Sequence, residues 1–322
     1  MIWHLVSPEF PPFIGGISTW TDAIATCLHQ AGEAVVVHVP ARITPLPRPF
    51  PIYRMAGRRW SRWAGTWARW SVLPHLRSGD RLLCATWQMA TGLVGRGVPV
   101  AIAFHGSELT RPSHHPHLHR TLDAAELLLP VSDYLGGLLG GRPYRRLPYP
   151  IRREAPVARG EVLLSVSRLV PQKAVHRVLE LGRQLGRPVV VVGDGPLRGE
   201  LQRHATRIGA EATFLGALPF NEIPWAGSWA AALLSEPLPD GSGAEGLGLV
   251  LLEAAARGLP TLGSTTGGIP EAAWYTLPDR NSFTIPEPPP PQEVQRTLEE
   301  RHSPEACLLE LKKLGTRSVD KV

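Results

Sequence analysis

Two basic residues in the second half of the chain are placed where a phosphate ligand would need them. Arg168 and Lys173 are five residues apart, in the turn that should follow a strand at 162–167. The guanidinium is a planar fork and the ammonium a compact charge, and both pair with phosphate oxygens. The two cations therefore suit a diphosphate, although an ordinary solvated loop would carry the same residues.

Two acidic residues flank a glycine loop in the same half. Glu245 and Glu253 are eight residues apart, and if a helix begins at about Leu247 they are separated by roughly 12 Å at 1.5 Å per residue. A diphosphate at the N-terminus of that helix would lie between the carboxylates, each of which would reach hydroxyl groups on its own side. This spacing matches a nucleoside diphosphate sugar. The alternative is a capping acid followed by a solvated helix residue.

Four glycine-bearing loops are expected to follow strands, at 11–16, 193–196, 244–248 and 265–271. Ligands of open α/β sheets bind outside the carboxyl ends of the strands, so all four loops lie at that kind of edge. Glycine lets the backbone approach a phosphate, and N–H groups at a helix start add partial positive charge. A single such loop is more often only a turn. The candidate binding positions are Gly15, Gly16, Gly193, Gly195, Gly246, Leu247, Gly248 and Leu249.

Short apolar runs alternate with helix-length segments along the chain, which is typical of βαβ units around a parallel sheet. The predicted strands are 2–7, 34–39, 81–85, 98–104 and 127–131 in the first half, and 162–167, 188–193, 212–215, 230–235 and 260–263 in the second. The predicted helices are 17–31, 174–185, 197–209, 247–257 and 292–314. The pattern predicts two separate α/β sheets.

Glycine and proline residues interrupt any regular element in 140–160, where we place a domain boundary. The sequence predicts a first domain at 1–150 and a second at 151–291, which ends in a stiff proline-rich connector at 286–291. The remaining segment, 292–322, is expected to be helical and to cross back to the first domain.

Length and composition agree with two globular domains. The chain has 322 residues, whereas a typical domain has roughly 150. With 43% hydrophobic and 19% charged residues it can bury substantial cores. The cysteines, Cys27, Cys84 and Cys307, form no CxxC pair, which argues against a zinc site or a disulfide framework and favours a reduced, cytosolic compartment. We see no signal peptide and no membrane-spanning apolar run, and expect neither export nor insertion.

The formal charge of +6 is concentrated in the first half. Residues 1–150 contain 15 arginines, no lysine and 8 acidic residues, a balance of +7. Such a basic surface would face an anionic membrane, an acidic substrate or a nucleic acid. Charge alone does not choose among these partners.

Two common nucleotide-binding motifs are not supported. The run 193–198 begins like a dinucleotide fingerprint, but Arg198 stands where close helix packing needs a third glycine. The chain also lacks a GxxxxGK[ST] loop for a nucleoside triphosphate. Neither a dehydrogenase nor a P-loop enzyme is therefore expected.

Taken together, these motifs resemble the GT-B glycosyltransferases of family 4, the glycosyl transferases group 1. The resemblance covers roughly residues 1–285 and implies an α/β fold with two Rossmann-like domains facing each other across a cleft. Its motifs are Pro11-Pro12 with Gly15-Gly16, His105-Gly106-Ser107-Glu108, Val131-Ser132, the runs 167–173, 190–196 and 214–216, the run 245–254 and Gly267-Gly268-Ile269-Pro270-Glu271.

The resemblance also implies roles for the residues of the second half. Arg168 and Lys173 would bind the donor diphosphate and stabilise the departing nucleotide. Glu245 would contact the transferred sugar and Glu253 the ribose, while the backbone N–H groups of 246–249 would contact the sugar and β-phosphate. The implied reaction retains the configuration of the sugar and uses no metal and no cofactor apart from the nucleoside diphosphate sugar donor.

In the first half, the resemblance implies that Gly16 approaches the phosphate and that His105 contacts the sugar near the reacting carbon. The implied partners are the nucleotide-sugar donor and a carbohydrate or glycolipid acceptor, with no nucleic acid. A nucleotide-sugar epimerase of the same fold and a non-catalytic nucleotide-sugar-binding subunit are the alternative functions.

Some segments depart from the family pattern. Ala174 replaces the glycine that usually follows the lysine, the run 147–151 lacks an Asn-Gly turn, and 279–282 lacks glycines. The chain is also short between Pro40 and Arg81 and at its C-terminus. These departures concern acceptor identity and domain closure more than donor binding.

A stripe of tryptophans in the basic half has helical spacing. Its members are Trp60, Trp63, Trp67 and Trp70, with Arg58, Arg59, Arg62 and Arg69 nearby. The stripe would pack on the sheet of the first domain, dock at an anionic membrane surface or bind the acceptor. Docking would make the protein peripheral at the inner face of the membrane. The histidine-rich run 113–119 is expected to be an exposed loop broken by proline, without a metal.

Overall fold

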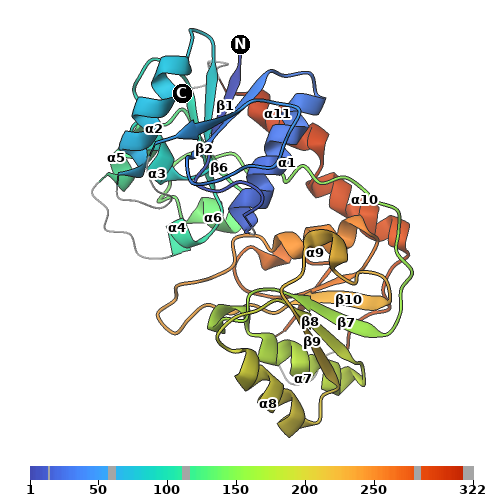
Figure 1. Ribbon diagram of the computed structural model, residues 1–322. Helices are drawn as coiled ribbons and strands as arrows, with labels where there is room; N and C mark the ends of the chain where they lie inside the picture. Colours follow the sequence, from blue (N-terminus) through green and yellow to red (C-terminus); the bar gives the residue numbers. More distant parts are fainter. Residues whose placement is uncertain (14, 57–62, 111–116, 279–283, 315–322) are drawn as a thin grey trace. The chain divides into compact units, whose positions relative to one another are not determined.

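Two parallel six-stranded sheets organise the chain in the computed structural model, which describes residues 1–13, 15–56, 63–110, 117–278 and 284–314 (Figure 1). The first sheet belongs to a unit made of Met1–Pro150 and His302–Val322, and the second to a unit made of Ile151–Arg301.

The first sheet has the strand order β3-β2-β1-β4-β5-β6, with all neighbouring strands parallel. Its strands are β1 (Trp3–Val6), β2 (Val35–Pro40), β3 (Ile52–Met55), β4 (Arg81–Cys84), β5 (Val100–Phe104) and β6 (Leu127–Pro130). The helices of this unit are α1 (Gly16–Gln30), α2 (Ala64–Val72), α3 (Trp87–Ala90), α4 (Ser107–Thr110), α5 (Leu118–Ala124), α6 (Asp133–Gly137) and α11 (Pro304–Lys312), with a 3-10 turn η1 (Leu73–His75).

The second sheet has the order β12-β11-β10-β7-β8-β9 and is also parallel throughout. Its strands are β7 (Val162–Val166), β8 (Val189–Val192), β9 (Ala212–Gly216), β10 (Ser228–Leu233), β11 (Thr261–Ser264) and β12 (Tyr275–Leu277). The helices are α7 (Val175–Leu185), α8 (Arg198–Ile208), α9 (Leu249–Ala256) and α10 (Pro291–Arg301), with 3-10 turns η2 (Pro171–Lys173), η3 (Phe220–Glu222) and η4 (Ile269–Glu271).

Helices cover both faces of the second sheet, because alternate strand residues point to opposite sides. Leu163 packs with the apolar faces of α7 and α8. Leu164, the next residue, packs on the other face with Ala254 of α9. Figure 1 shows α7 and α8 on one side of the strands and α9 on the other.

Both sheets have the strand order of a Rossmann fold, in which the direction of winding reverses once. The reversal lies between β1 and β4 in the first sheet and between β7 and β10 in the second. Ligands of such sheets bind at this point, beyond the carboxyl ends of the strands. The α/β fold class with two Rossmann-like units is confirmed.

Several elements differ from the sequence-based expectation, among them the short helices α3 to α6, two edge strands and the last predicted helix. The edge strands β3 and β12 were not expected, because they contain only four and three residues and have no long apolar run. The helix expected at 292–314 is two helices, α10 and α11. Ser303 caps α11 by accepting a hydrogen bond from the Ala306 N–H (3.1 Å), and Pro304 occupies its first turn, where proline starts a helix rather than continuing one.

The three described tryptophans of the stripe lie at the surface instead of packing on the sheet. The buried residues of α2 are small, namely Ala64, Gly65, Ala68 and Val72, whereas Trp63, Trp67 and Trp70 are 54%, 38% and 68% exposed. A Cβ on Gly92 would lie 2.0 Å from the Gly65 carbonyl oxygen, so α2 contacts the segment after α3 through its backbone. This contact turns the small face inward and the tryptophans outward. The remaining residues of the stripe, Trp60, Arg58, Arg59 and Arg62, lie outside the described residues, as do 113–116 of the histidine run.

No helix in the described parts of the chain combines the length and the apolar composition that crossing a bilayer requires.

Backbone loops at the carboxyl edge of the second sheet lie unusually close together. The loop after β8 packs on the loop after β7, where a Cβ on Gly193 would lie 1.8 Å from the Ser167 carbonyl oxygen and a Cβ on Gly195 would lie 2.4 Å from that of Leu169. Gly193 also has a φ of 135°, which L side chains rarely adopt. These positions therefore exclude any side chain.

Replacing Gly193 with alanine should lower the free energy of unfolding by at least about 2 kcal/mol, because the new Cβ collides with backbone and its φ is unfavourable. Gly186→Ala is the matched control. Gly186 has a φ of 62° but no atom within 4 Å of a Cβ, so alanine there should lower the free energy of unfolding by only about 1 kcal/mol. Urea denaturation measures both, and equal losses would contradict the close approach.

A buried histidine pair lies in the first sheet. His4 Nδ1 and His38 Nε2 are 2.9 Å apart, and His4 Nε2 lies 3.4 Å from an Asp80 carboxylate oxygen. Burial, together with the nearby His4 and His75, lowers the pKa of His38 to about 3. His38 is therefore neutral in the folded protein at pH values where the unfolded chain carries a charge.

This difference predicts a loss of stability in acid. Below pH 6.5, the ordinary pKa of histidine, the unfolded chain takes up a proton that folded His38 does not, so the free energy of unfolding falls by about 1.4 kcal/mol per pH unit. His38→Gln removes this titration. Between pH 7 and 5 the variant should lose about 2 kcal/mol less than the wild type in urea titrations. The exposed His119 provides a control, His119→Gln, and a His38 variant with wild-type pH dependence would refute the assignment.

Candidate functional site

Lys173 and Glu245 meet at the reversal point of the second sheet. Lys173 ends the turn η2 after β7, and Glu245 lies in the loop between β10 and α9. Their side chains form an ion pair that is 18% and 23% exposed. Because β7 and β10 are neighbouring parallel strands, their carboxyl ends bring the predicted cation and the predicted carboxylate together.

Arg168 lies in the same loop, five residues before Lys173, and is exposed. Its neighbours Ser167 and Leu169 are held by the loop after β8: the Ser167 N–H donates to the Val192 carbonyl (3.0 Å), and the Leu169 N–H donates to that of Asp194 (2.9 Å). Gly193 and Gly195 permit this packing. The contacts fix the backbone at Arg168 and leave its guanidinium at the surface, within reach of an anion.

Ala174, directly after Lys173, is the N-cap of α7 and has a left-handed conformation with φ 41° and ψ 42°. Among the described residues it is the one non-glycine with a positive φ. L-residues rarely adopt this conformation. The turn that places Lys173 is therefore maintained although the sequence has alanine where the family pattern has glycine.

The loop before α9 carries the predicted glycines. Gly246, Leu247 and Gly248 are buried, and Gly248 is the N-cap of α9 with a φ of 88°. No side chain caps the helix, and its first turn contains no acidic residue. The N–H groups at its start, from Leu249 onward, therefore remain suited to an anion.

A third loop supports Glu245 from the other side. The Gly268 N–H donates to the Glu245 carbonyl (2.9 Å), and a Cβ on Gly267 would lie 2.4 Å from the same oxygen. The loop after β11 thus fixes the backbone of Glu245, while Lys173 fixes its carboxylate.

Glu253 lies on α9, one turn before Arg257, and its side chain is partly buried. Burial raises the pKa of Glu253 to about 7, the Arg257 cation opposes this shift, and the Glu154 carboxylate adds to it. A carboxylate that titrates near neutral pH accepts hydrogen bonds from hydroxyl groups best in its charged form. Neither Arg257 nor Glu154 was identified from the sequence, because no local sequence motif indicates that the two side chains pair.

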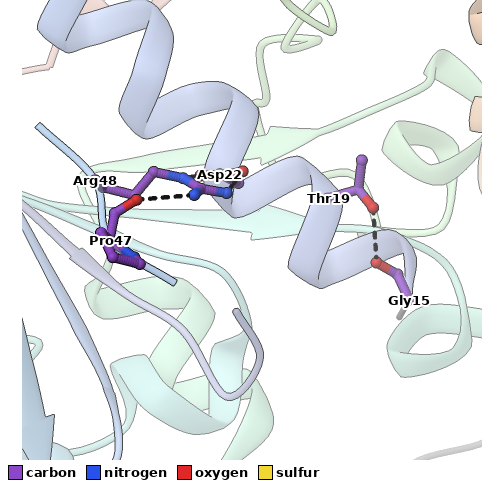
Figure 2. Close-up of polar contacts among 5 residues, drawn as sticks. All are labelled: Gly15, Thr19, Asp22, Pro47 and Arg48. Atoms are coloured by element: carbon purple, nitrogen blue, oxygen red, sulfur yellow. Dashed lines mark hydrogen bonds and ion pairs between the residues drawn. The ribbon is translucent and has the colours of Figure 1, made fainter. Parts of the chain in front are cut away.

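In the first unit, the predicted glycines begin α1. Gly15 is the N-cap and Gly16 the first residue, with no acidic residue in the first turn. The Gly15 carbonyl accepts hydrogen bonds from the Thr19 N–H (3.0 Å) and hydroxyl (3.2 Å; Figure 2). A Cβ on Gly15 would lie 2.9 Å from a carboxylate oxygen of Glu9, a buried residue that follows β1. Sequence reasoning did not identify Glu9, although an acidic residue shortly after a buried strand is a recognisable signal of a functional position.

A proline-rich segment, 45–51, is tied along α1. Arg48 forms a bidentate ion pair with Asp22 of α1, with N–O distances of 2.7 and 2.6 Å, and donates to the Pro47 carbonyl (3.0 Å; Figure 2). The Phe50 ring lies against His29 near the end of α1, 5.9 Å between centroids. Because alternate residues are prolines without N–H groups, these side-chain contacts add to a few backbone hydrogen bonds, such as that from the Val37 N–H to the Pro51 carbonyl (3.0 Å).

His105 follows β5 and lies against the ring of Trp20, 4.6 Å between centroids. Burial lowers the pKa of His105 to about 4, so it is neutral at pH 7; a hydrogen bond with the Ala85 backbone opposes the shift. Its Nε2 has no partner in the described structure, which leaves this nitrogen able to accept a hydrogen bond. The Glu108 carboxylate accepts from the His105 backbone N–H and so fixes the turn.

The predicted residues thus fall into two groups, one in each unit. Lys173 and Glu245 touch, and the loops of Arg168 and of α9 surround them. Gly15, Gly16 and His105 lie at the carboxyl edge of the first sheet.

Comparisons with known proteins agree with this geometry. Residues 151–275 match the family model "Glycosyl transferases group 1". The chain is 26% identical over 321 residues to a GDP-mannose-dependent alpha-(1-6)-phosphatidylinositol monomannoside mannosyltransferase of Mycobacterium tuberculosis, covering 84% of this chain and 82% of the relative. A Corynebacterium glutamicum mannosyltransferase described as acting on the monoacylated form is 34% identical over 117 residues, 34% of this chain and 31% of the relative.

Solved structures share the fold across the whole chain. The glycosyltransferase AviGT4, involved in Avilamycin A biosynthesis, superposes with a TM-score of 0.70 at 18% identity, covering 97% of this chain and 96% of its own. Anabaena Alr3699/HepE in complex with UDP and glucose gives a TM-score of 0.70 at 16% identity, covering 97% and 98%. The chain thus has two Rossmann-like units, as the GT-B glycosyltransferases do, and its second unit carries the match to the group 1 glycosyltransferase family model.

Proposed function

We propose that the protein transfers a sugar from a nucleoside diphosphate sugar to an acceptor hydroxyl, with retention of configuration and without a metal. The observation that carries the proposal is the meeting of Lys173, Glu245 and the uncapped start of α9 at the reversal point of the second sheet. The lysine and the N–H groups of the helix start suit the leaving diphosphate, and the glutamate carboxylate suits the sugar hydroxyls.

The roles of the charged residues follow from the negative charge that develops on the departing diphosphate during transfer. The bond between the anomeric carbon and the diphosphate oxygen breaks, the acceptor oxygen bonds to the same face of that carbon, and the acceptor proton passes to the departing diphosphate. Lys173 exchanges the Glu245 carboxylate for the diphosphate, and Arg168 and the α9 N–H groups add positive charge. These groups supply the charge that a divalent cation provides elsewhere. Glu245 is then free to accept hydrogen bonds from the sugar hydroxyls.

His105 acts as a neutral hydrogen-bond acceptor for a sugar hydroxyl. Its lowered pKa and unpartnered Nε2 support this role, because a protonated imidazole would repel the positive charge of an oxocarbenium-like transition state. Gly16 begins α1, whose N–H groups at the helix start suit an anion.

We propose GDP-mannose as the donor and a phosphatidylinositol mannoside or similar glycolipid as the acceptor. Support comes from the relatives, whose names specify GDP-mannose and phosphatidylinositol monomannoside. UDP-glucose is the alternative donor to test, because a structural neighbour was solved with it.

A lipid acceptor also accounts for the exposed tryptophans. Trp63, Trp67 and Trp70 extend from the outer face of α2, and the Arg69 guanidinium lies 5.6 Å from the Trp70 ring centroid. Residues 1–150 carry a balance of +7. Aromatic rings with neighbouring cations suit an anionic membrane interface, so the protein associates peripherally with it.

The direct test is release of nucleoside diphosphate from GDP-mannose and from UDP-glucose, with and without phosphatidylinositol monomannoside, in the presence of EDTA. We expect release of the nucleoside diphosphate to depend on the acceptor. We also expect NMR to show that the product has the anomeric configuration of the donor. Conversion of the donor without acceptor would instead indicate an epimerase. Donor binding without turnover on an acceptor panel would indicate a non-catalytic subunit.

Lys173→Ala should lower kcat by at least about 100-fold, because the leaving diphosphate loses a positioned cation. Lys313→Ala is the matched control, since Lys313 also forms an ion pair, with Glu310 on α11. The control should retain wild-type turnover in the nucleotide-release assay. Near-normal kcat for Lys173→Ala would remove this residue from the mechanism.

Replacing Trp63, Trp67 and Trp70 together with serine should lower binding to phosphatidylglycerol-containing vesicles by at least about tenfold in a sedimentation assay. Leu309→Ser removes an exposed apolar side chain from α11 instead and should leave binding unchanged. Absence of wild-type binding at low salt, where surface electrostatics are strongest, would exclude the membrane interface.

A further inference from the structure

Arg257 lies directly after α9 with its guanidinium held on several sides. Nη1 donates to the Glu253 carbonyl oxygen (2.8 Å), and Nη2 lies 2.7 Å from a carboxylate oxygen of Glu154. The rings of Phe220 and Trp225 lie on it, each with its centroid 5.0 Å from Cζ. Arg257 is only 8% exposed, so this cation is fixed in place and largely removed from solvent.

The fixed cation lies one helical turn after the Glu253 carboxylate. In the described structure, the charged groups that interact with Glu253 are Arg257 from its own helix end and Glu154 from the segment before β7. The neighbouring helix α10 presents the neutral Gln295, whose amide donates to two backbone carbonyl groups (2.7 and 2.8 Å). The electrostatic surroundings of Glu253 therefore consist of one cation and one anion, and these two are paired with each other.

We propose that Arg257, with Glu154 as its counterion, is a positioning residue for nucleotide binding, which holds the Glu253 carboxylate in the charged form that accepts hydrogen bonds from the ribose hydroxyls. The inference rests on the proposed function, because that function places the ribose at Glu253. No motif in the sequence assigned a role to Arg257 or Glu154.

The physical reason is a balance between burial and charge. Burial favours the neutral acid, a nearby cation favours the carboxylate and a nearby anion opposes it. The pKa of Glu253, raised to about 7, reflects these three influences in that order of size, with Arg257 second and Glu154 third. Hydroxyl donors from a bound ribose stabilise the carboxylate further, so binding near pH 7 releases a proton from the fraction of Glu253 that is still neutral.

The experiment is calorimetric titration with GDP at pH 6, 7 and 8.5, with the pH 7 titrations repeated in buffers of different ionisation enthalpy to count released protons. Wild type should release more protons at pH 7 than Glu253→Gln, which reports the contribution of the diphosphate alone. Arg257→Met should weaken GDP binding about fivefold at pH 7 and approach wild-type affinity at pH 8.5, because removing the cation raises the pKa of Glu253 further. It should also release more protons.

Three further variants distinguish the effect of the Arg257 charge from that of the Glu154 charge and from general effects of losing an arginine. Arg257→Lys keeps the charge and should keep the wild-type pH profile even if it lowers thermal stability. Glu154→Gln removes the anion and should strengthen binding at pH 6. Arg187→Met removes a guanidinium that lies over another ring, Trp229, at 4.2 Å, and should change neither affinity nor proton release.

The outcomes separate the inference from the proposed function. If wild type binds neither GDP nor UDP, the proposed function fails. If wild type binds GDP but Arg257→Met weakens binding by the same factor at pH 6 and 8.5, or not at all, the positioning role is overturned while the proposed function stands.

Discussion

Backbone packing between loops at the carboxyl edge of the second sheet fixes the positions of Arg168 and Glu245. A Cβ on Gly193 would lie 1.8 Å from the Ser167 carbonyl oxygen, and one on Gly267 would lie 2.4 Å from that of Glu245. Neither contact tolerates a side chain, so the loops after β7, β8, β10 and β11 form one interlocked surface. Arg168 and Glu245 occupy fixed positions on it, and the first turn of α9 opens beside them.

Charge on this surface is balanced before any substrate binds. Lys173 is neutralised by Glu245, and a diphosphate that takes over the lysine frees the carboxylate for sugar hydroxyls. At the C-terminal end of α9, the Arg257 cation opposes the burial that raises the pKa of Glu253, whereas the Glu154 carboxylate adds to the effect of burial. In both places an ion pair keeps a charged group ready in a partly dry environment, where it interacts more strongly than in water.

Much of the fold was predictable from the sequence, because buried parallel strands read as continuous apolar runs and parallel neighbours end at the same edge. That rule also brings Lys173 and Glu245 together. The outward face of α2 was not predictable, because it depends on Gly65 meeting Gly92, a contact between elements that no periodicity reports. The role of Arg257 was not predictable for the same reason. Its partner Glu154 is distant along the chain, and an arginine at a helix end suggests by itself only solvent exposure.

A crystal structure of the protein with GDP bound would test the central claim most directly, that a nucleoside diphosphate occupies the reversal point of the second sheet. The diphosphate is predicted within hydrogen-bond distance of the Lys173 Nζ and of N–H groups at the start of α9, with the ribose hydroxyls on the Glu253 carboxylate. A diphosphate bound elsewhere, with Lys173 still paired to Glu245, would contradict the account.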